Sequence, residues 1–187
     1  LNIELLKRVI VGFIPTGILG FTVYKLVKHY LLGSVQIVVW SLIIGGIILI
    51  LYEKFGKHEN NDLSTISYRD ALLLGLFQSI AMIPGVSRSA ATIIGGLLLG
   101  YKRESAVEFS FLLAIPTMFA AAGFDLISNR EMLANSDVTL LFIGFVVAFA
   151  TALVAIKWLL LFIKSHSFIG FGVYRIVVGL VIFFILL

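Results

Sequence analysis

The chain has 187 residues, of which 60% are hydrophobic and only 13% are charged, and its mean hydropathy is +1.12. Because soluble domains carry about a quarter charged residues, this composition excludes an ordinary soluble domain and indicates an integral membrane protein. The net charge of +4 comes from basic residues in short loops, where they set membrane topology, and the lack of cysteine excludes disulfides and thiolate metal sites.

Five apolar segments approach or exceed the roughly 20 residues that a helix needs to cross a bilayer. Their continuous apolar runs favour helices over the alternating pattern of a membrane β-barrel. The predicted spans cover residues 9–24, 31–52, 106–127, 138–163 and 168–187. The sequence therefore predicts an all-α integral membrane fold, a polytopic helical bundle with about five full spans.

A hydrophilic stretch, residues 53–70, separates the second span from two shorter apolar segments and is predicted to be a cytoplasmic loop. The shorter segments, residues 71–83 and 90–100, would be about 16 to 20 Å long as helices, too short for a hydrocarbon core of about 30 Å. A Pro-Gly break lies between them. We therefore predict that residues 71–100 form a re-entrant helical hairpin whose tip lies near mid-membrane.

The tip of this predicted hairpin carries the motif Pro84-Gly-Val-Ser-Arg-Ser89. Ionisable groups inside membrane segments are costly and usually functional, and arginine, hydroxyls and the N–H groups of a helix N-terminus all bind phosphate. The predicted phosphate ligands are Gly85, Ser87, Arg88, Ser89, Thr92 and Gln78, with Arg88 and Ser87 as the predicted catalytic residues. The alternative is an ordinary loop tip in water, if both arms cross the membrane.

Two further charged residues lie within predicted spans. Glu108 is either a secondary site residue or an interfacial carboxylate near a helix N-terminus. Arg175 is either a second phosphate contact or a buried partner for a carboxylate, and the structural role is favoured. Gly95, Gly96 and Gly100 predict close helix packing.

At these residues the chain resembles the undecaprenyl-diphosphatase family, the bacitracin-resistance type of polyprenyl-diphosphate phosphatase. The matching stretches are Gly75-Leu-Phe-Gln78, Pro84-Gly-Val-Ser-Arg-Ser-Ala-Ala-Thr92 and Glu108-Phe-Ser-Phe-Leu-Leu-Ala-Ile-Pro116. The resemblance implies a hydrolase that cleaves undecaprenyl diphosphate to undecaprenyl phosphate and phosphate. This reaction recycles the lipid carrier for cell-wall synthesis and is linked to bacitracin resistance. The implied location is the bacterial inner (plasma) membrane, as a multi-pass protein.

The resemblance also implies an inverted-repeat fold with two hairpin tips, and a divalent metal, Mg²⁺ or Ca²⁺, held by carboxylates of the first hairpin. This chain has no match to that first hairpin, so the metal ligands are left unassigned. Together with the start at Leu1, this leads us to expect a single membrane domain, residues 1–187, equivalent to the C-terminal two-thirds of a member. The expected partners are the polyprenyl diphosphate lipid and the bilayer, not nucleic acid, and a homodimer is left open.

Three hypotheses about function remain at this point. The first is a lipid-diphosphate phosphatase in which water or a serine is the nucleophile. The second is a protein that binds or transports polyprenyl phosphate without hydrolysis, because broken helices that meet at mid-membrane also occur in transporters. The third is an inactive remnant of poor stability, whose packing faces would be left unburied without a partner repeat.

Overall fold

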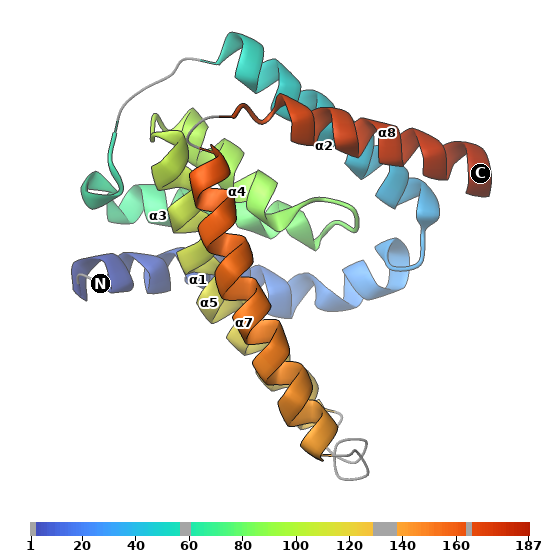
Figure 1. Ribbon diagram of the computed structural model, residues 1–187. Coiled ribbons are helices and arrows are strands. Elements are labelled where there is room, and N and C mark those ends of the chain that lie inside the picture. Colours follow the sequence, from blue (N-terminus) through green and yellow to red (C-terminus); the bar gives the residue numbers. More distant parts are fainter. Residues whose placement is uncertain (1–2, 57–60, 129–137, 164–165) are drawn as a thin grey trace.

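The computed structural model describes residues 3–56, 61–128, 138–163 and 166–187, and the regular structure in these ranges is helical (Figure 1). The helices are α1 (Ile3–Leu26), α2 (Val35–Phe55), α3 (Tyr68–Ser79), α4 (Arg88–Leu98), α5 (Arg103–Ser128), α7 (Val138–Ile163) and α8 (Ile169–Leu186). A π-helical turn, Val27–Leu31, continues α1, and short 3-10 turns, Leu63–Thr65 and Ile80–Met82, lie on either side of α3. The predicted all-α fold is confirmed.

Five of these helices, α1, α2, α5, α7 and α8, are long and apolar enough to cross a membrane. They overlap the five predicted spans. α1 and α5 extend beyond both predicted limits, whereas α2 is shifted: it begins at Val35, not at residue 31, and ends at Phe55, not at residue 52. The stretch 53–70, however, is not a loop throughout. Its first residues belong to α2, which ends at Phe55, and its last residues belong to α3, which begins at Tyr68.

The C-terminal end of α2 is held in place by contacts with the helices that follow the hairpin tip. The Tyr52 hydroxyl donates a hydrogen bond to the Leu97 carbonyl of α4 at 2.7 Å. The Glu53 carboxylate, whose side chain is only 4% exposed, forms an ion pair with Arg103 at the start of α5. These tertiary contacts explain why the helix continues into a stretch whose polarity alone suggests a loop.

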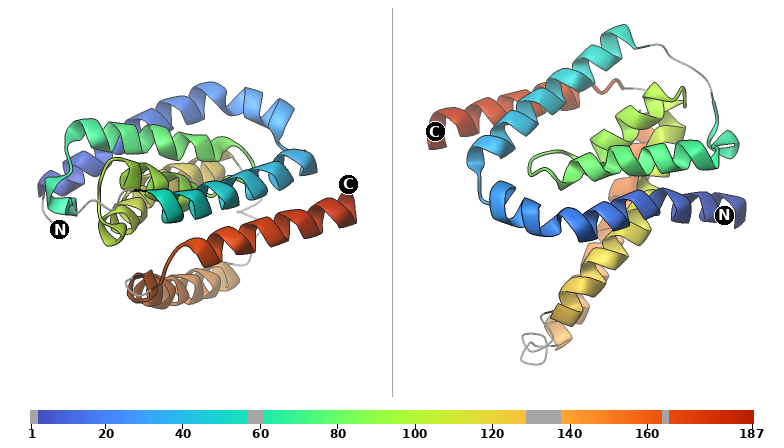
Figure 2. Two further views of the ribbon diagram at one scale, coloured as in Figure 1. Left: turned by 90° about the horizontal axis from the view of Figure 1, so that it is seen from above. Right: turned by 180° about the vertical axis from the view of Figure 1, so that it is seen from behind.

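Two pairs of helices approach so closely that their contacts require glycine. A Cβ atom on Gly75 of α3 would lie 1.9 Å from the carbonyl oxygen of Gly12 of α1. A Cβ atom on Gly46 of α2 would lie 2.6 Å from the carbonyl oxygen of Gly172 of α8. The two views of Figure 2 show both pairs side by side. Small residues suit such contacts because apolar side chains gain little by leaving lipid tails, so close packing drives helix association.

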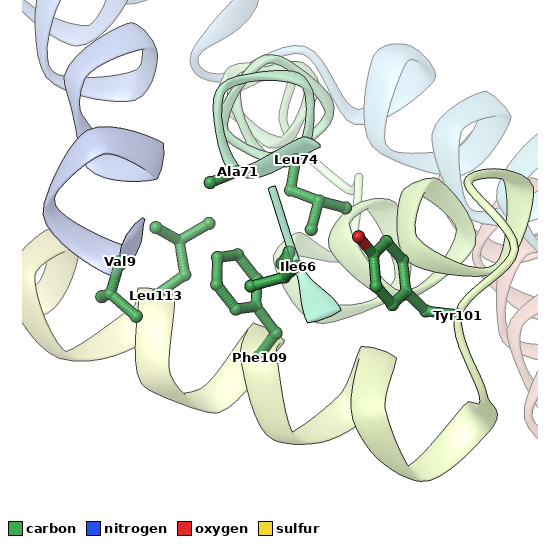
Figure 3. Packing of buried hydrophobic residues seen from close by; sticks show 7 residues of the cluster. All are labelled: Val9, Ile66, Ala71, Leu74, Tyr101, Phe109 and Leu113. Atoms are coloured by element: carbon green, nitrogen blue, oxygen red, sulfur yellow. The ribbon is translucent and has the colours of Figure 1, made fainter. Parts of the chain in front are cut away.

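Two clusters of buried side chains hold the hairpin between the longer helices. The first joins α1, α3, α5 and the ends of the hairpin (Figure 3) and contains Val9, Ile66, Ala71, Leu74, Tyr101, Phe109 and Leu113. The second joins α4 to α2, α5 and the α7–α8 connection and contains Leu49, Ile93, Leu97, Ala106, Val107, Ile163 and Phe168. The hairpin is therefore packed on both sides, which fixes the position of its tip.

The helices α3 and α4 form a hairpin whose two ends are tied together. The Asn61 N–H donates to the Gly100 carbonyl at 3.2 Å, and the Tyr101 hydroxyl donates to the Asp70 carboxylate at 2.8 Å. The arms have 12 and 11 residues, about 18 and 16 Å at the helical rise of about 1.5 Å per residue. The geometry fits the predicted hairpin, and its re-entry into the bilayer stays a prediction.

The three glycines predicted to allow close packing have two different functions. A Cβ atom on Gly95 would lie 2.6 Å from the Phe77 ring, and one on Gly96 would lie 2.8 Å from the Ala106 Cβ. Close packing is confirmed at both. Gly100 instead follows the end of α4 with a φ of +86°, a left-handed conformation that glycine adopts at little cost after a helix.

Candidate functional site

The tip of the hairpin is formed by residues 83–87, between the 3-10 turn after α3 and the first residue of α4. Gly85 has a φ of +86°, and a Cβ atom there would lie 2.7 Å from the Val38 carbonyl oxygen. The tip therefore packs directly on the backbone of α2. Ser87 then caps α4, because its Oγ accepts a hydrogen bond from the Ala90 N–H at 3.2 Å.

Arg175 of α8 connects the tip to α2. Its Nη2 donates to the Gly85 carbonyl at 3.0 Å and to the Ser41 carbonyl at 3.1 Å. The guanidinium fits because Gly45 of α2 has no side chain: a Cβ atom there would lie 2.7 Å from Nη2. One terminal nitrogen thus satisfies two carbonyls from two other segments.

A cavity of about 340 Å³ lies beside the tip, between the hairpin, α5, α7 and α8. Its polar lining residues are Ser87, Ser89, Ser110, Tyr174 and Arg175. Its apolar lining residues are Leu49, Ala90, Ile93, Val107, Phe111, Leu159, Ile163, Phe168 and Phe171. The Ser87 and Ser89 hydroxyls lie 3.3 Å apart. Hydroxyls and a cation beside a largely apolar wall suit an amphiphile with an anionic head group.

The N-terminus of α4 has an uncompensated positive charge. Arg88 is the first residue of this helix, where a cation opposes the helix dipole. Its Nη1 is buried and has no hydrogen-bond partner among the described residues. A buried cationic donor without a partner is costly, and an anion bound at this helix end would offset both effects. Ser87 and Ser89 on either side line the cavity, whereas Arg88 does not in this conformation.

The comparison with known proteins agrees with this chemistry. The family described as bacitracin resistance protein BacA matches residues 1–181. The chain belongs to the BacA family. Several relatives carry the name undecaprenyl-diphosphatase. The relative from a Sulfurihydrogenibium species is 54% identical, over 96% of this chain and 72% of the relative. The one from Aquifex aeolicus is 53% identical, over 95% and 70%, and the one from Persephonella marina is 50% identical, over 96% and 71%.

Gln78, a predicted phosphate ligand, lies in a different environment in this BacA chain. It is 2% exposed, and its Nε2 donates to the Thr16 and Thr117 hydroxyls, each at 3.0 Å. Thr16 in turn donates to the Gly75 carbonyl at 2.9 Å. This polar network joins α1, α3 and α5. In this conformation Gln78 therefore links three helices and does not line the cavity.

Two other predicted residues also lie away from the cavity lining. Thr92 is buried, and its hydroxyl donates to the Arg88 carbonyl one turn earlier at 3.0 Å, so it is bonded within its own helix. Glu108 is exposed on α5. The structure thus gathers Ser87, Ser89 and Arg175 on one cavity and places Gly85 in the adjoining tip.

The side chains that line the cavity do not form a binding site for a divalent metal ion. Divalent metals such as Mg²⁺ and Ca²⁺ prefer carboxylate oxygens, and the residues that line the cavity include none. Across the described ranges, the structure shows no group of three or more His, Cys, Asp or Glu residues able to hold a metal ion. We therefore derive no chemical step through a protein-bound metal.

Sequence reasoning missed Ser110 and Tyr174 as lining residues, although a signal for them is present. On α5 the lining residues are Val107, Ser110 and Phe111, the i, i+3, i+4 spacing of one helix face. On α8 the lining continues through Phe171 and Tyr174 at the same spacing. Reading helix faces, rather than charged residues alone, would have found both.

Proposed function

We propose that this chain hydrolyses undecaprenyl diphosphate to undecaprenyl phosphate and phosphate, recycling the lipid carrier for cell-wall synthesis and conferring bacitracin resistance. The observation that carries the proposal is the cavity beside Ser87, Ser89 and Arg175, in a chain about half identical to relatives named undecaprenyl-diphosphatase. An anionic head with a long apolar tail matches the two kinds of surface in that cavity.

The head group would lie at the N-terminus of α4. Backbone N–H groups there, together with the Ser87 and Ser89 hydroxyls, are donors for phosphate oxygens. Arg88 would supply the positive charge that stabilises the phosphoryl group during transfer, as preorganised cationic groups do in phosphoryl transfer. We propose that its side chain turns toward the head group when the lipid binds, which gives the unpaired Nη1 a partner.

The tail would follow the apolar walls of the cavity. A second hollow, of about 540 Å³, shares Phe171 and Tyr174 with the first and is also lined by Phe162, His166, Ser167 and Gly170. The shared residues make the two hollows adjacent, so an extended prenyl chain has a path along aromatic side chains away from the tip. This path supports a lipid rather than a soluble diphosphate as the substrate.

A divalent metal remains part of the proposal, by resemblance to the family. Because the described residues offer no carboxylate set in the cavity, such an ion would rely on the oxygens of the diphosphate itself, as Mg²⁺ commonly does with substrate phosphates. Phosphate release should then require added Mg²⁺ or Ca²⁺ and stop in a chelator. Release that continues unchanged in a chelator would remove the metal from the proposal.

The second candidate is binding or transport of a polyprenyl phosphate without hydrolysis. It is favoured by the same observation, since no carboxylate lines the cavity to act as a general base or a metal ligand. The two candidates differ in their products. A binding protein would retain a polyprenyl phosphate with its phosphate intact, whereas the phosphatase would release inorganic phosphate from the diphosphate.

The deciding experiment measures phosphate release from undecaprenyl diphosphate by purified residues 1–187 in detergent, with Mg²⁺ or Ca²⁺. Arg88→Ala is the test variant, and Arg69→Ala, at an exposed position on α3, is the matched control. Release by the wild type and Arg69→Ala, with at least about a hundredfold loss in Arg88→Ala, supports the phosphatase. Tight binding of undecaprenyl phosphate without release supports the second candidate.

Within the described ranges, five helices suit a multi-pass membrane protein. We place it in the bacterial inner membrane and carry a homodimer forward as a prediction. The location is supported by the lipid substrate that we propose. Fractionation of cell membranes tests the location, and light scattering of the detergent-solubilised protein tests the dimer.

A further inference from the structure

Ser110 of α5 is a buried hydroxyl on the wall of the cavity. It is 2% exposed, and it lines the cavity together with Ser87 and Ser89. Its Oγ has no hydrogen-bond partner among the described residues. Leaving a buried hydroxyl unpaired costs about 1 to 3 kcal/mol, so a serine at this position needs an explanation beyond packing.

Three other buried or half-buried hydroxyls show the usual solution. The hydroxyls of Ser79, Thr92 and Thr117 each donate to the carbonyl one turn earlier in their own helix, at 2.8 to 3.0 Å. This back-bonding satisfies a hydroxyl in an apolar helix. Ser110 does not form that bond, although a carbonyl is available one turn earlier at Ala106. Its donor is therefore uncommitted on the side of α5 that faces the tip.

We propose that Ser110 is a third hydroxyl ligand for the phosphate head group, donated by α5 opposite the two serines of the hairpin. The inference rests on the proposed function and adds a residue to its site. Rotation about the single χ1 bond between staggered rotamers redirects a serine Oγ, so the hydroxyl can turn to a phosphate oxygen without backbone movement. Ser110 would then bind the substrate and connect the head group to α5, a helix outside the hairpin.

A binding role and a packing role predict opposite effects on stability. If Ser110 is a ligand group, Ser110→Ala removes an unpaired buried hydroxyl, so the melting temperature of the ligand-free protein should stay level or rise. Ligand binding should weaken. If Ser110 serves only packing, Ser110→Ala should lower the melting temperature, because packing contacts of the buried Oγ are lost, and should leave ligand binding unchanged.

Ser105 provides a matched control on the same helix. It is 7% exposed, lies outside the cavity lining, and its Oγ accepts a hydrogen bond from the Leu63 N–H at 3.1 Å. Ser105→Ala is the same chemical change but leaves a backbone donor unpaired. It should lower the melting temperature and leave ligand binding as in the wild type, the reverse of the result expected for Ser110→Ala.

The test measures melting temperature and the dissociation constant of a non-hydrolysable farnesyl bisphosphonate, in detergent, for wild type, Ser110→Ala, Ser110→Cys and Ser105→Ala. We expect about tenfold weaker binding in both Ser110 variants, with unchanged binding in Ser105→Ala. The cysteine variant keeps the side chain close to its original size and weakens only the donor, so it guards against a folding defect in the alanine variant.

The possible failures are distinguishable. If the wild type and both Ser110 variants bind the bisphosphonate with the same dissociation constant, the role of Ser110 is overturned. The proposed function then stays intact. A wild type that neither binds the bisphosphonate nor releases phosphate from undecaprenyl diphosphate overturns the proposed function and the role of Ser110 with it.

Discussion

The Nη2 atom of Arg175 donates a hydrogen bond of 3.0 Å to the carbonyl oxygen of Gly85, 90 residues earlier in the sequence. The same Nη2 holds the Ser41 carbonyl, so the tip of the hairpin, α2 and α8 meet at one side chain. Gly85 lies two residues before Ser87, which caps α4 and lines the cavity. The position of the predicted head-group site therefore depends on an arginine that reaches it from the last helix.

Arg175→Lys should weaken this link. Both hydrogen bonds come from Nη2, and a lysine side chain ends one atom short of that position, so its ammonium would lie farther from both carbonyls. We expect a loss of stability of about 1 kcal/mol, the size of a hydrogen bond between membrane helices. Because small misplacements of reacting groups are costly, we also expect kcat/KM for undecaprenyl diphosphate to fall about 10- to 100-fold. Thermal melting and phosphate release measure the two effects, with Arg69→Lys as control. Full activity in Arg175→Lys would show that the hydrogen bonds from Nη2 are not required.

Gly45→Ala tests the same link without changing the arginine. Its Cβ would lie 2.7 Å from Nη2, and the end of a flexible side chain can move away. The move breaks the same two hydrogen bonds, so we expect losses of stability and activity similar to those of Arg175→Lys. The control is Gly144→Ala in α7, where an added Cβ meets nothing within 4 Å. Equal activity in Gly45→Ala and Gly144→Ala would show that the position of the Arg175 guanidinium does not affect catalysis.

Much of the fold follows from the sequence because its signals are local. The span 138–163 coincides with α7, and the hairpin follows from two apolar arms that are too short to cross a bilayer. The predicted end of the second span was wrong because the end of α2 depends on contacts of Tyr52 and Glu53 with residues far along the chain. Polarity in a short window contains no information about such contacts.

The sequence predicted which motif lies beside the cavity, but it predicted less well which side chains of the hairpin point toward the cavity. Ser87 and Ser89 line the cavity. Arg175 does link helices, but its partners are the Ser41 and Gly85 carbonyls and not the carboxylate that the sequence suggested. Gln78 was expected at the cavity because it lies on the first arm, but its amide bonds to Thr16 and Thr117. Which face of a short helix a polar residue occupies depends on partners from other helices, and those partners are not adjacent in sequence.

Gly75→Ala should disrupt the fold. The added Cβ would lie 1.9 Å from the Gly12 carbonyl oxygen, a backbone atom that cannot move without separating α1 from α3. We expect a loss of more than about 3 kcal/mol, as for the severe class of core substitutions, visible as a low yield of monodisperse protein in detergent. Gly123→Ala, with nothing within 4 Å of its Cβ, should match or exceed wild-type stability. A wild-type melting curve for Gly75→Ala would contradict the contact.

Tyr101 should make the stability of the hairpin base depend on pH. Burial, and then the hydrogen bond to Asp70, raise the pKa of the Tyr101 phenol from 10 to about 12. Because the folded state holds this proton more tightly than the unfolded state, the stabilisation is fully present below pH 10 and is lost as the pH rises toward 12. Tyr101→Phe should cost about 1 kcal/mol at neutral pH and should flatten the decline between pH 10 and 12.

The measurement pairs melting curves across this pH range with titration of phenolate absorbance. The chain has six tyrosines, so the difference between the wild type and Tyr101→Phe isolates the one phenol of interest. Tyr30→Phe, at an exposed position, controls for the loss of a phenol as such. A difference spectrum that titrates at the ordinary tyrosine value would show that Tyr101 is neither buried nor bonded to Asp70. The hairpin base would then lack the link between Asp70 in the first arm and Tyr101, which follows the second arm.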